Sequence, residues 1–257
     1  MLPILYRTPW FFIYSYTAVF AIAIVLGMVV THRIAQNSDW LNGYLATFAA
    51  ALAGGRIGFV IIEWRYYQER PLSLQNLWQG GFNYHAALLA GFVGVWVWSW
   101  LGEQRCPSKK WALCAQTVTL FAPAFALTNS FGWFACWLEG CGYGVETVFK
   151  EGIGVLFVAD LPDNFGVFAI RYHTQWLGII YSLLIFFFAL RPKTKFLHVL
   201  LLISLGRFGI GLLRGDFVTQ IGMLPLNMLL DIALASLCLI LLQYASHGTK
   251  NRIRKQL

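Results

Sequence analysis

The chain has 257 residues, of which 58% are hydrophobic and only 12% charged, and its formal net charge is +8. A soluble domain typically carries about 25% charged residues, so this composition excludes an ordinary soluble protein and indicates an integral membrane protein. The positive charge does not indicate nucleic-acid binding, because no basic groove with interleaved aromatic residues accompanies it.

Apolar runs recur along the whole sequence, and most reach the roughly 17–25 residues that a helix needs to span a bilayer. We therefore predict an all-α integral membrane protein with a single domain over residues 1–257. The seven predicted spans are 11–31, 43–62, 84–102, 112–137, 175–190, 196–213 and 225–245. Tryptophans near the ends of several runs, such as Trp10, Trp40 and Trp64, predict an aromatic belt at the headgroup level.

The distribution of lysine and arginine predicts the orientation. With the N-terminus outside, eleven of the nineteen Lys and Arg residues fall in inner segments and six in outer ones. The positive-inside rule therefore favours N-out and C-in, the parity that seven spans require. Residues 138–174 then form an outer, irregular head segment, and residues 246–257 form a basic cytoplasmic tail that contacts anionic lipid.

The first candidate site residues lie in the first two predicted spans. Tyr14 and Tyr16 could donate hydrogen bonds into the helix bundle, with a place in the belt or core as the alternative. Arg56 follows Gly54 and Gly55 and precedes Gly58, so the backbone around its cation is open to close approach. Its planar guanidinium suits a phosphate or carboxylate. A structural cation, bonded to carbonyls or to Asp231, is the alternative.

Two further segments carry ionisable residues within predicted spans or at their edges, and an ionisable residue within the bilayer is a functional candidate by default. His85 begins the third predicted span after a glycine pair and is the side chain best suited to proton transfer near neutral pH. Arg207 and Arg214 are seven residues apart, which would place both on one helix face as an anion site. An interfacial role for His85 and snorkelling by Arg214 are the alternatives.

The stretch WFACWLEGCGYG, residues 133–144, is predicted to be irregular backbone lining a cavity, because irregular backbone cannot face lipid. Cys136 and Cys141 lie five residues apart, and the sequence leaves open whether they form a disulfide. No cluster of cysteine and histidine has the spacing of a metal site. We therefore predict neither a metal nor a cofactor.

Four segments, taken in order, resemble the prolipoprotein diacylglyceryl transferase family. They are GGRIGF (54–59), WQGGFNYHAALLAG (78–91), GCGYG (140–144) and GRFGIGLLRGD (206–216). The resemblance implies a bacterial inner-membrane enzyme with seven spans. Such an enzyme moves the diacylglyceryl group of phosphatidylglycerol onto the lipobox cysteine of a prolipoprotein and releases glycerol phosphate.

The resemblance also implies roles for particular residues. His85 and Arg207 would be catalytic, and Arg56 and Arg214 would bind the lipid phosphate together with Arg207. The remaining substrate-binding candidates are Gly55, Gly140, Gly144, Tyr14 and Gln175. Phosphatidylglycerol, a lipobox peptide and membrane lipids are the expected partners of a monomeric chain, and Glu139 is a further candidate acid or base.

This sequence departs from the family pattern at three charged positions. The signature arginine of the fourth span falls on Trp133, and the glutamate between the two arginines of the sixth span falls on Gly211. In YHTQWLG, Gln175 is retained, but the glutamate position is Gly178. These losses favour an alternative function, a catalytically impaired relative that binds anionic phospholipid or acts on another acceptor. A small transporter is a third and weaker alternative, since no inverted repeat is evident.

Overall fold

The computed structural model is predominantly helical, with three short hairpins at the connections. It describes residues 4–8, 10, 12–35, 40–77, 80–101, 107–148, 157–163, 165–192, 194–216 and 218–254, with the side chains of 107–112 and 247–254 excepted. The helices are α1 (Ser15–Ile34), α2 (Trp40–Ile62), α3 (Trp64–Glu69), η1 (Pro71–Gln75), α4 (Tyr84–Leu101), α5 (Pro107–Leu120), α6 (Ala122–Glu139), α7 (Thr174–Ala189), α8 (Phe196–Gly211) and α9 (Leu226–Arg254). The strands are β1 (Ile4–Arg7), β2 (Phe12–Tyr14), β3 (Val158–Pro162), β4 (Phe168–Tyr172), β5 (Gln220–Ile221) and β6 (Leu224–Pro225), paired as three antiparallel hairpins.

The long helices have the length and composition of membrane spans. Among the described residues, α1, α2, α4 and α9 qualify singly, and the bent pair α5–α6 makes a fifth candidate. Helices α7 and α8 are apolar but have 16 residues each, which corresponds to about 24 Å of helix. An all-α integral membrane protein with four or five candidate spans is therefore what the fold supports.

Each predicted span contains a helix, but two of the spans differ from their predicted course. Residues 12–14 form β2, so α1 begins only at Ser15. The predicted span 112–137 is broken at Phe121 with a bend of 43°, because Pro123 lacks the N–H of a continuous helix and its ring clashes with the preceding turn. Helix α9 continues to Arg254, through the described part of the predicted tail, and its candidate membrane span is Leu226–Ser246.

Helices α2 and α4 pack closely because small residues line their contact. A Cβ placed on Gly54 would lie 2.1 Å from the Cβ of Ala90, and one on Gly58 would lie 2.2 Å from the Cβ of Ala86. Side chains at these two positions would therefore force the helices apart. The glycine spacing around Arg56 thus serves helix packing.

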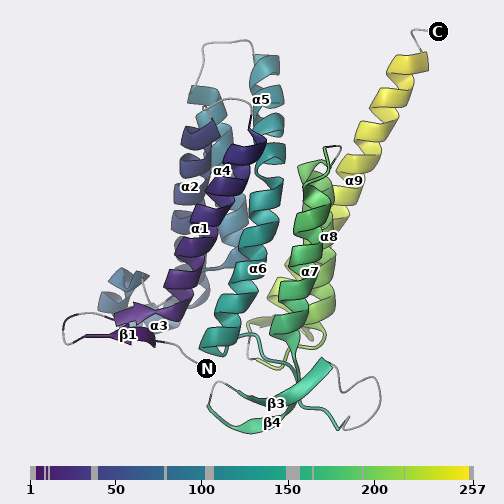
Figure 1. Cartoon of the computed structure of the whole chain (residues 1–257). Helices are drawn as coiled ribbons and strands as arrows, with labels where there is room; N and C mark the ends of the chain where they lie inside the picture. The colour runs from purple at the N-terminus through teal and green to yellow at the C-terminus, as the bar shows by residue number, and fades with distance from the viewer. Residues whose placement is uncertain are drawn as a thin grey trace.

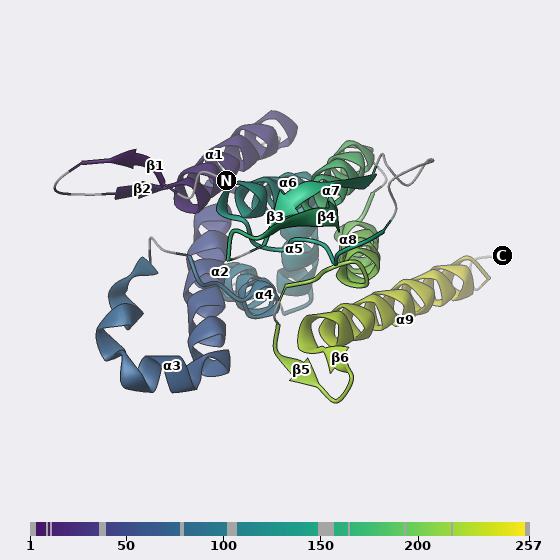
Figure 2. The same ribbon diagram turned by 90° about the horizontal axis from the view of Figure 1, so that it is seen from below.

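The molecule has two distinct ends (Figure 1). The strands β1, β3 and β4 and the short helix α3 lie at one end, and the C-terminal end of α9 projects at the other. Seen from below, the β1–β2 hairpin and α3 extend to the sides of the helical bundle (Figure 2). Between α6 and α7, β3 and β4 pair over five residues each, so the predicted irregular head segment contains a regular hairpin.

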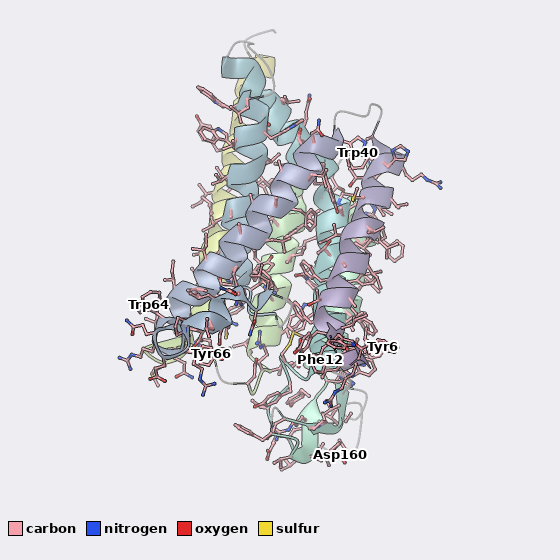
Figure 3. All side chains as sticks on the ribbon, turned by 90° about the vertical axis from the view of Figure 1, so that its left-hand side faces the viewer. Tyr6, Phe12, Trp40, Trp64, Tyr66 and Asp160 are labelled. Carbon is pink, nitrogen blue, oxygen red and sulfur yellow. A yellow bond between two sulfur atoms is a disulfide. The ribbon has the colours of Figure 1, made fainter. Side chains whose placement is uncertain are left out.

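Aromatic side chains occur at both ends (Figure 3). Trp64 and Tyr66 are exposed at the hairpin end, as a belt requires. Trp40, at the opposite end, is buried and packs edge-on against Tyr44. Its assignment to the belt is wrong, because its indole belongs to a core cluster to which α1, α2, α4, α5 and α6 contribute.

Candidate functional site

A cavity of about 700 Å³ lies between α1, α2, α4, α6, α8 and α9. Its wall is apolar along the helices, where Phe20, Phe48 and Phe92 contribute rings. At the hairpin end the wall becomes more polar and includes Tyr16, His85, Glu139, Arg207 and Arg214. An apolar chamber that ends in cationic and proton-transferring groups fits a lipid with an anionic headgroup.

The centre of the polar end is a buried carboxylate with two partners. Asp231, on α9, has an exposure of 2% and lies with its Oδ1 2.9 Å from the Nε2 of His85 on α4. The same Oδ1 is 3.5 Å from the Nε of Arg207 on α8. Three helices therefore meet through one carboxylate, and the two residues predicted to be catalytic lie side by side.

Arg207 is held on an aromatic face. Its Cζ lies 3.7 Å from the ring centroid of Tyr84, which is the distance of a cation–π contact. The guanidinium makes no hydrogen bond to another described residue, and its side chain remains 15% exposed towards the cavity. Its N–H groups are thus available to an anionic ligand.

Arg56 has a different environment from the other two arginines. Its Nη1 donates to the carbonyls of Gly80 and Gly81 at 2.9 and 3.2 Å. Its Nη2 donates to those of Ser73 and Leu74 at 3.0 and 3.3 Å. These bonds clamp the connection between α3 and α4, and Arg56 is not among the residues of the cavity wall. The contacts of Arg56 are thus those of a structural cation bonded to carbonyls, which the sequence analysis gave as the alternative to a phosphate-binding role.

Gly55 and Asn83 complete the approach to His85. The backbone N–H of Asn83 donates to the carbonyl of Gly55 at 2.8 Å, and the Asn83 side chain accepts the N–H of Ala86 at 2.9 Å. The second bond satisfies an otherwise unpaired donor in the first turn of α4. Gly55 and Arg56 therefore hold the segment that precedes His85 in place. Neither residue is part of the cavity wall.

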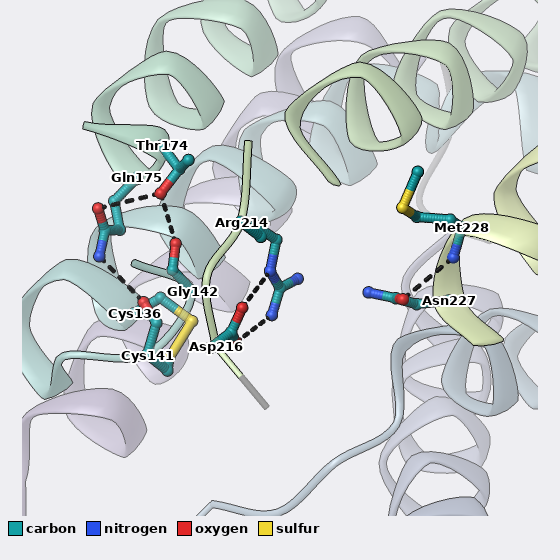
Figure 4. Close-up of polar contacts among 9 residues, drawn as sticks. All are labelled: Cys136, Cys141, Gly142, Thr174, Gln175, Arg214, Asp216, Asn227 and Met228. Atoms are coloured by element: carbon teal, nitrogen blue, oxygen red, sulfur yellow. Dashed lines mark hydrogen bonds and ion pairs between the residues drawn. A yellow bond between two sulfur atoms is a disulfide. The ribbon is translucent and has the colours of Figure 1, made fainter. Parts of the chain in front are cut away.

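Arg214 lies beyond the end of α8, so the prediction that it shares a helix face with Arg207 is wrong. Helix α8 ends at Gly211, and Arg214 pairs with Gly144 in an isolated β-bridge. Its Nε donates to the Oδ1 of Asp216 at 2.8 Å, and its Nη2 donates to Oδ2 (Figure 4). Arg214 nevertheless lines the same cavity as Arg207.

The turn after α6 is fixed from several sides (Figure 4). Cys136 and Cys141 form a disulfide, which the sequence left open. Gly140 has a φ of 89°, which favours glycine as the residue that ends the helix. Gln175 donates to the carbonyl of Cys141 at 3.1 Å, and Thr174 to that of Gly142. Gln175, Gly140 and Gly144 therefore shape the turn, and the cavity wall is formed by Cys136, Cys141 and Gly142.

Trp133 occupies the wall at the position where the resemblance expects an arginine. Its indole is 6% exposed and lies over Gly178 of α7: a Cβ on that glycine would be 2.2 Å from Trp133 Cδ2. The expected glutamate falls on Gly178 itself. At these two positions the structure has one indole ring that covers a glycine.

On α1, Tyr16 and not Tyr14 faces the cavity. Tyr14 ends β2, whereas Tyr16 lies in the first turn of α1 and contributes to the wall near Glu139. The sequence indicates both tyrosines as candidates, but which of them faces the cavity depends on where β2 ends and α1 begins. Tyr84 and Asp216 were not singled out from the sequence, since an aromatic ring and a loop aspartate have no distinctive spacing.

Outside the helices, a second polar cluster stabilises the head segment. Arg171 on β4 is buried and donates to Glu146 at 2.8 Å. Backbone N–H donation from Val167, with further help from Phe165 and Arg171, lowers the pKa of Asp163. Burial lowers the pKa of His173 at the start of α7. No group of three or more potential metal ligands occurs in the part of the chain that the structure describes.

The fold and the site together define a class, a helical integral membrane protein whose apolar cavity ends in a His–Asp–Arg cluster. The model of the prolipoprotein diacylglyceryl transferase family matches residues 3–244, and the chain belongs to this family.

Several curated relatives carry the corresponding name. The phosphatidylglycerol–prolipoprotein diacylglyceryl transferase 2 of Clostridium perfringens is 28% identical over 86% of each chain. The transferase of Clostridium tetani is 26% identical over 90% of this chain and 93% of its own length. That of Synechocystis is 26% identical over 91% and 86%, respectively.

Proposed function

We propose that this protein is a phosphatidylglycerol–prolipoprotein diacylglyceryl transferase. The observation that carries the proposal is that His85, Arg207 and Arg214 line one cavity whose remaining wall is mostly apolar. The names of the relatives supply the donor lipid and the acceptor protein. The acyl chains would occupy the apolar part, and the headgroup would meet the arginines.

The reaction requires a thiolate and a stabilised leaving group. The sulfur of the lipobox cysteine attacks the diacylglyceryl carbon that carries the phosphate ester, a C–S bond forms and the C–O bond breaks. His85 accepts the thiol proton, because the thiolate is the nucleophile. Arg207 and Arg214 stabilise the negative charge of the departing glycerol phosphate, which fixed cations do well in a site sheltered from water.

We further propose seven spans with the N-terminus outside, in the bacterial inner membrane and as a monomer. A helix within each predicted run supports seven spans. The position of β1 and the C-terminal end of α9 at opposite ends of the molecule fits an odd number of crossings. Helices α7 and α8 are short for a bilayer of about 30 Å, so local thinning or flanking residues would have to complete those spans.

A specific observation favours the alternative, a lipid-binding relative without turnover. Trp133 fills the wall where the resemblance expects a cation, and Arg214 is already paired with a carboxylate. Such a site would still bind an anionic lipid through Arg207. The experiment therefore has to measure binding and turnover separately.

The test is transferase activity of the purified protein with phosphatidylglycerol and a fluorescent lipobox peptide. We expect His85→Ala to lower kcat by about 10²–10⁴-fold and Arg207→Ala by about 10²–10³-fold. Arg65→Ala, an exposed arginine near the same end, serves as the control and should leave the rate unchanged. Absence of turnover, with phosphatidylglycerol binding that Arg207→Ala weakens, would establish the alternative.

A further inference from the structure

Asp231 has the burial of a core residue and the partners of an active-site residue. It is 2% exposed and is not part of the cavity wall, although both of its partners are. A carboxylate removed from water is costly unless it is paired, so His85 and Arg207 are required to keep it there. Since it does not reach the cavity, Asp231 can influence a bound lipid only through these two side chains.

The contact with His85 determines which ring nitrogen is left for chemistry. The Nε2 of His85 lies 2.9 Å from Asp231 Oδ1, so this nitrogen carries the proton that the carboxylate accepts. The Nδ1 is then the nitrogen with a free lone pair. A carboxylate bonded to one nitrogen of an imidazole fixes both its tautomer and its ring orientation.

The contact with Arg207 determines the orientation of the cation. Tyr84 supports the guanidinium plane from one face, and Asp231 lies 3.5 Å from its Nε. The Nε edge therefore faces the protein interior. The terminal N–H groups are left to meet an anion in the cavity.

The packing of α8 against α9 explains why this carboxylate comes from α9. The resemblance expects a glutamate at Gly211, one helical turn after Arg207. A Cβ at Gly211 would lie 2.9 Å from the Cγ of Met228, so α9 occupies the space above that glycine. Asp231 follows Met228 by three residues and therefore lies on the same side of α9. The negative charge expected from α8 is thus supplied from the neighbouring helix.

We infer that Asp231 is the positioning residue of this site: it holds His85 in the tautomer that accepts the thiol proton and orients Arg207 towards the lipid phosphate. This inference rests on the proposed transferase function. It does not concern the identity of the donor or the acceptor. It concerns how the protein holds the side chains of His85 and Arg207 in the positions that the reaction needs.

The test combines Asp231→Asn, His85→Ala and the double variant in the assay with phosphatidylglycerol vesicles and lipobox peptide. Asn retains the size of Asp but removes the charge, and we expect kcat to fall by about 10–100-fold. The KM for phosphatidylglycerol should rise by less than kcat falls, because Asp231 does not touch the lipid and affects its binding only through the orientation of Arg207. In the His85→Ala background, Asp231→Asn should cause a smaller further loss than in the wild type, since the part of its effect that acts through His85 is already gone and only the part that acts through Arg207 remains. Asp231→Glu should restore part of the rate, and Asp160→Asn, an exposed head-segment aspartate, is the matched control.

Three results would overturn the inference: an Asp231→Asn variant as active as the wild type, a rise in KM alone, or losses that multiply in the double variant. If the wild-type protein shows no turnover, the proposed function fails on its own. In that case, the midpoint of unfolding in detergent is measured for the wild type, the two single variants and the double variant. Non-additive shifts of the midpoint would support the coupling of Asp231 to His85, and additive shifts would contradict it.

Discussion

Trp133 and Gly178 pack so closely that the residue at one position restricts the residue at the other. The indole lies where any side chain at 178 would have to be, and both positions are ones at which the resemblance expects a charge. A buried arginine without its glutamate, or the reverse, would leave an unpaired charge at a cost of several kcal/mol. An indole over a glycine carries no charge that needs a partner, and it makes this part of the wall apolar.

At this scale we predict the effect of adding one methyl group. Gly178→Ala would place a Cβ 2.2 Å from the Trp133 ring, so we expect it to lower the free energy of unfolding by about 1–3 kcal/mol through overpacking. Gly132→Ala, in the adjacent helix α6, has no atom within 4 Å of the added Cβ and should be neutral or stabilising. Unfolding titrations in detergent measure both variants. Equal stabilities would contradict the packing argument.

At the scale of elements, the site depends on connections more than on helices. The segment from Gly80 to Asn83 positions His85, and the turn at 140–145 meets the segment that carries Arg214. Each connection is fixed by side chains from other elements: Arg56 for the first, and Thr174, Gln175 and a disulfide for the second. Glycines permit these close approaches, as Gly144 does, where a Cβ would lie 2.3 Å from the Tyr172 carbonyl.

We predict that the Cys136–Cys141 disulfide contributes measurably to stability. The loop that it closes is short, so the chain-entropy estimate is only about 2 kcal/mol. The Cys136→Ser/Cys141→Ser variant should lower the midpoint of unfolding accordingly. A reductant should lower the wild-type midpoint to the same value and leave the double variant unchanged. A reductant effect of equal size in both proteins would mean that another thiol is responsible.

At the scale of the whole molecule, the two ends differ in structure and in charge. The hairpins and α3 lie at one end, while α9 carries the basic C-terminal segment away from them. The positive-inside rule assigns the basic end to the cytoplasm, which places the polar end of the cavity on the outer side. A donor lipid from the outer leaflet and an exported peptide would then meet the site from the same side.

The orientation can be tested by labelling with a membrane-impermeant maleimide, in a Cys106→Ser background. Phe165 is 78% exposed at the β3–β4 hairpin, and Ser246 is exposed near the end of α9. We expect Phe165→Cys to be labelled in intact spheroplasts and Ser246→Cys only after permeabilisation. Labelling of both in intact spheroplasts would exclude an odd number of spans between the two ends.

The sequence by itself determined the membrane class, the approximate position of every long helix, the family, and His85, Arg207 and Arg214 as site candidates. Composition and motif order suffice for these features because apolar run length and local residue patterns are properties of contiguous chain. Only the tertiary structure decided that Arg56 binds carbonyls, that Tyr16 replaces Tyr14 in the wall, that two cysteines are joined and that Asp231 unites His85 with Arg207. These outcomes depend on which helices meet and at what distance. Residues 85, 207 and 231 come together only through packing between α4, α8 and α9, which no spacing along the chain records.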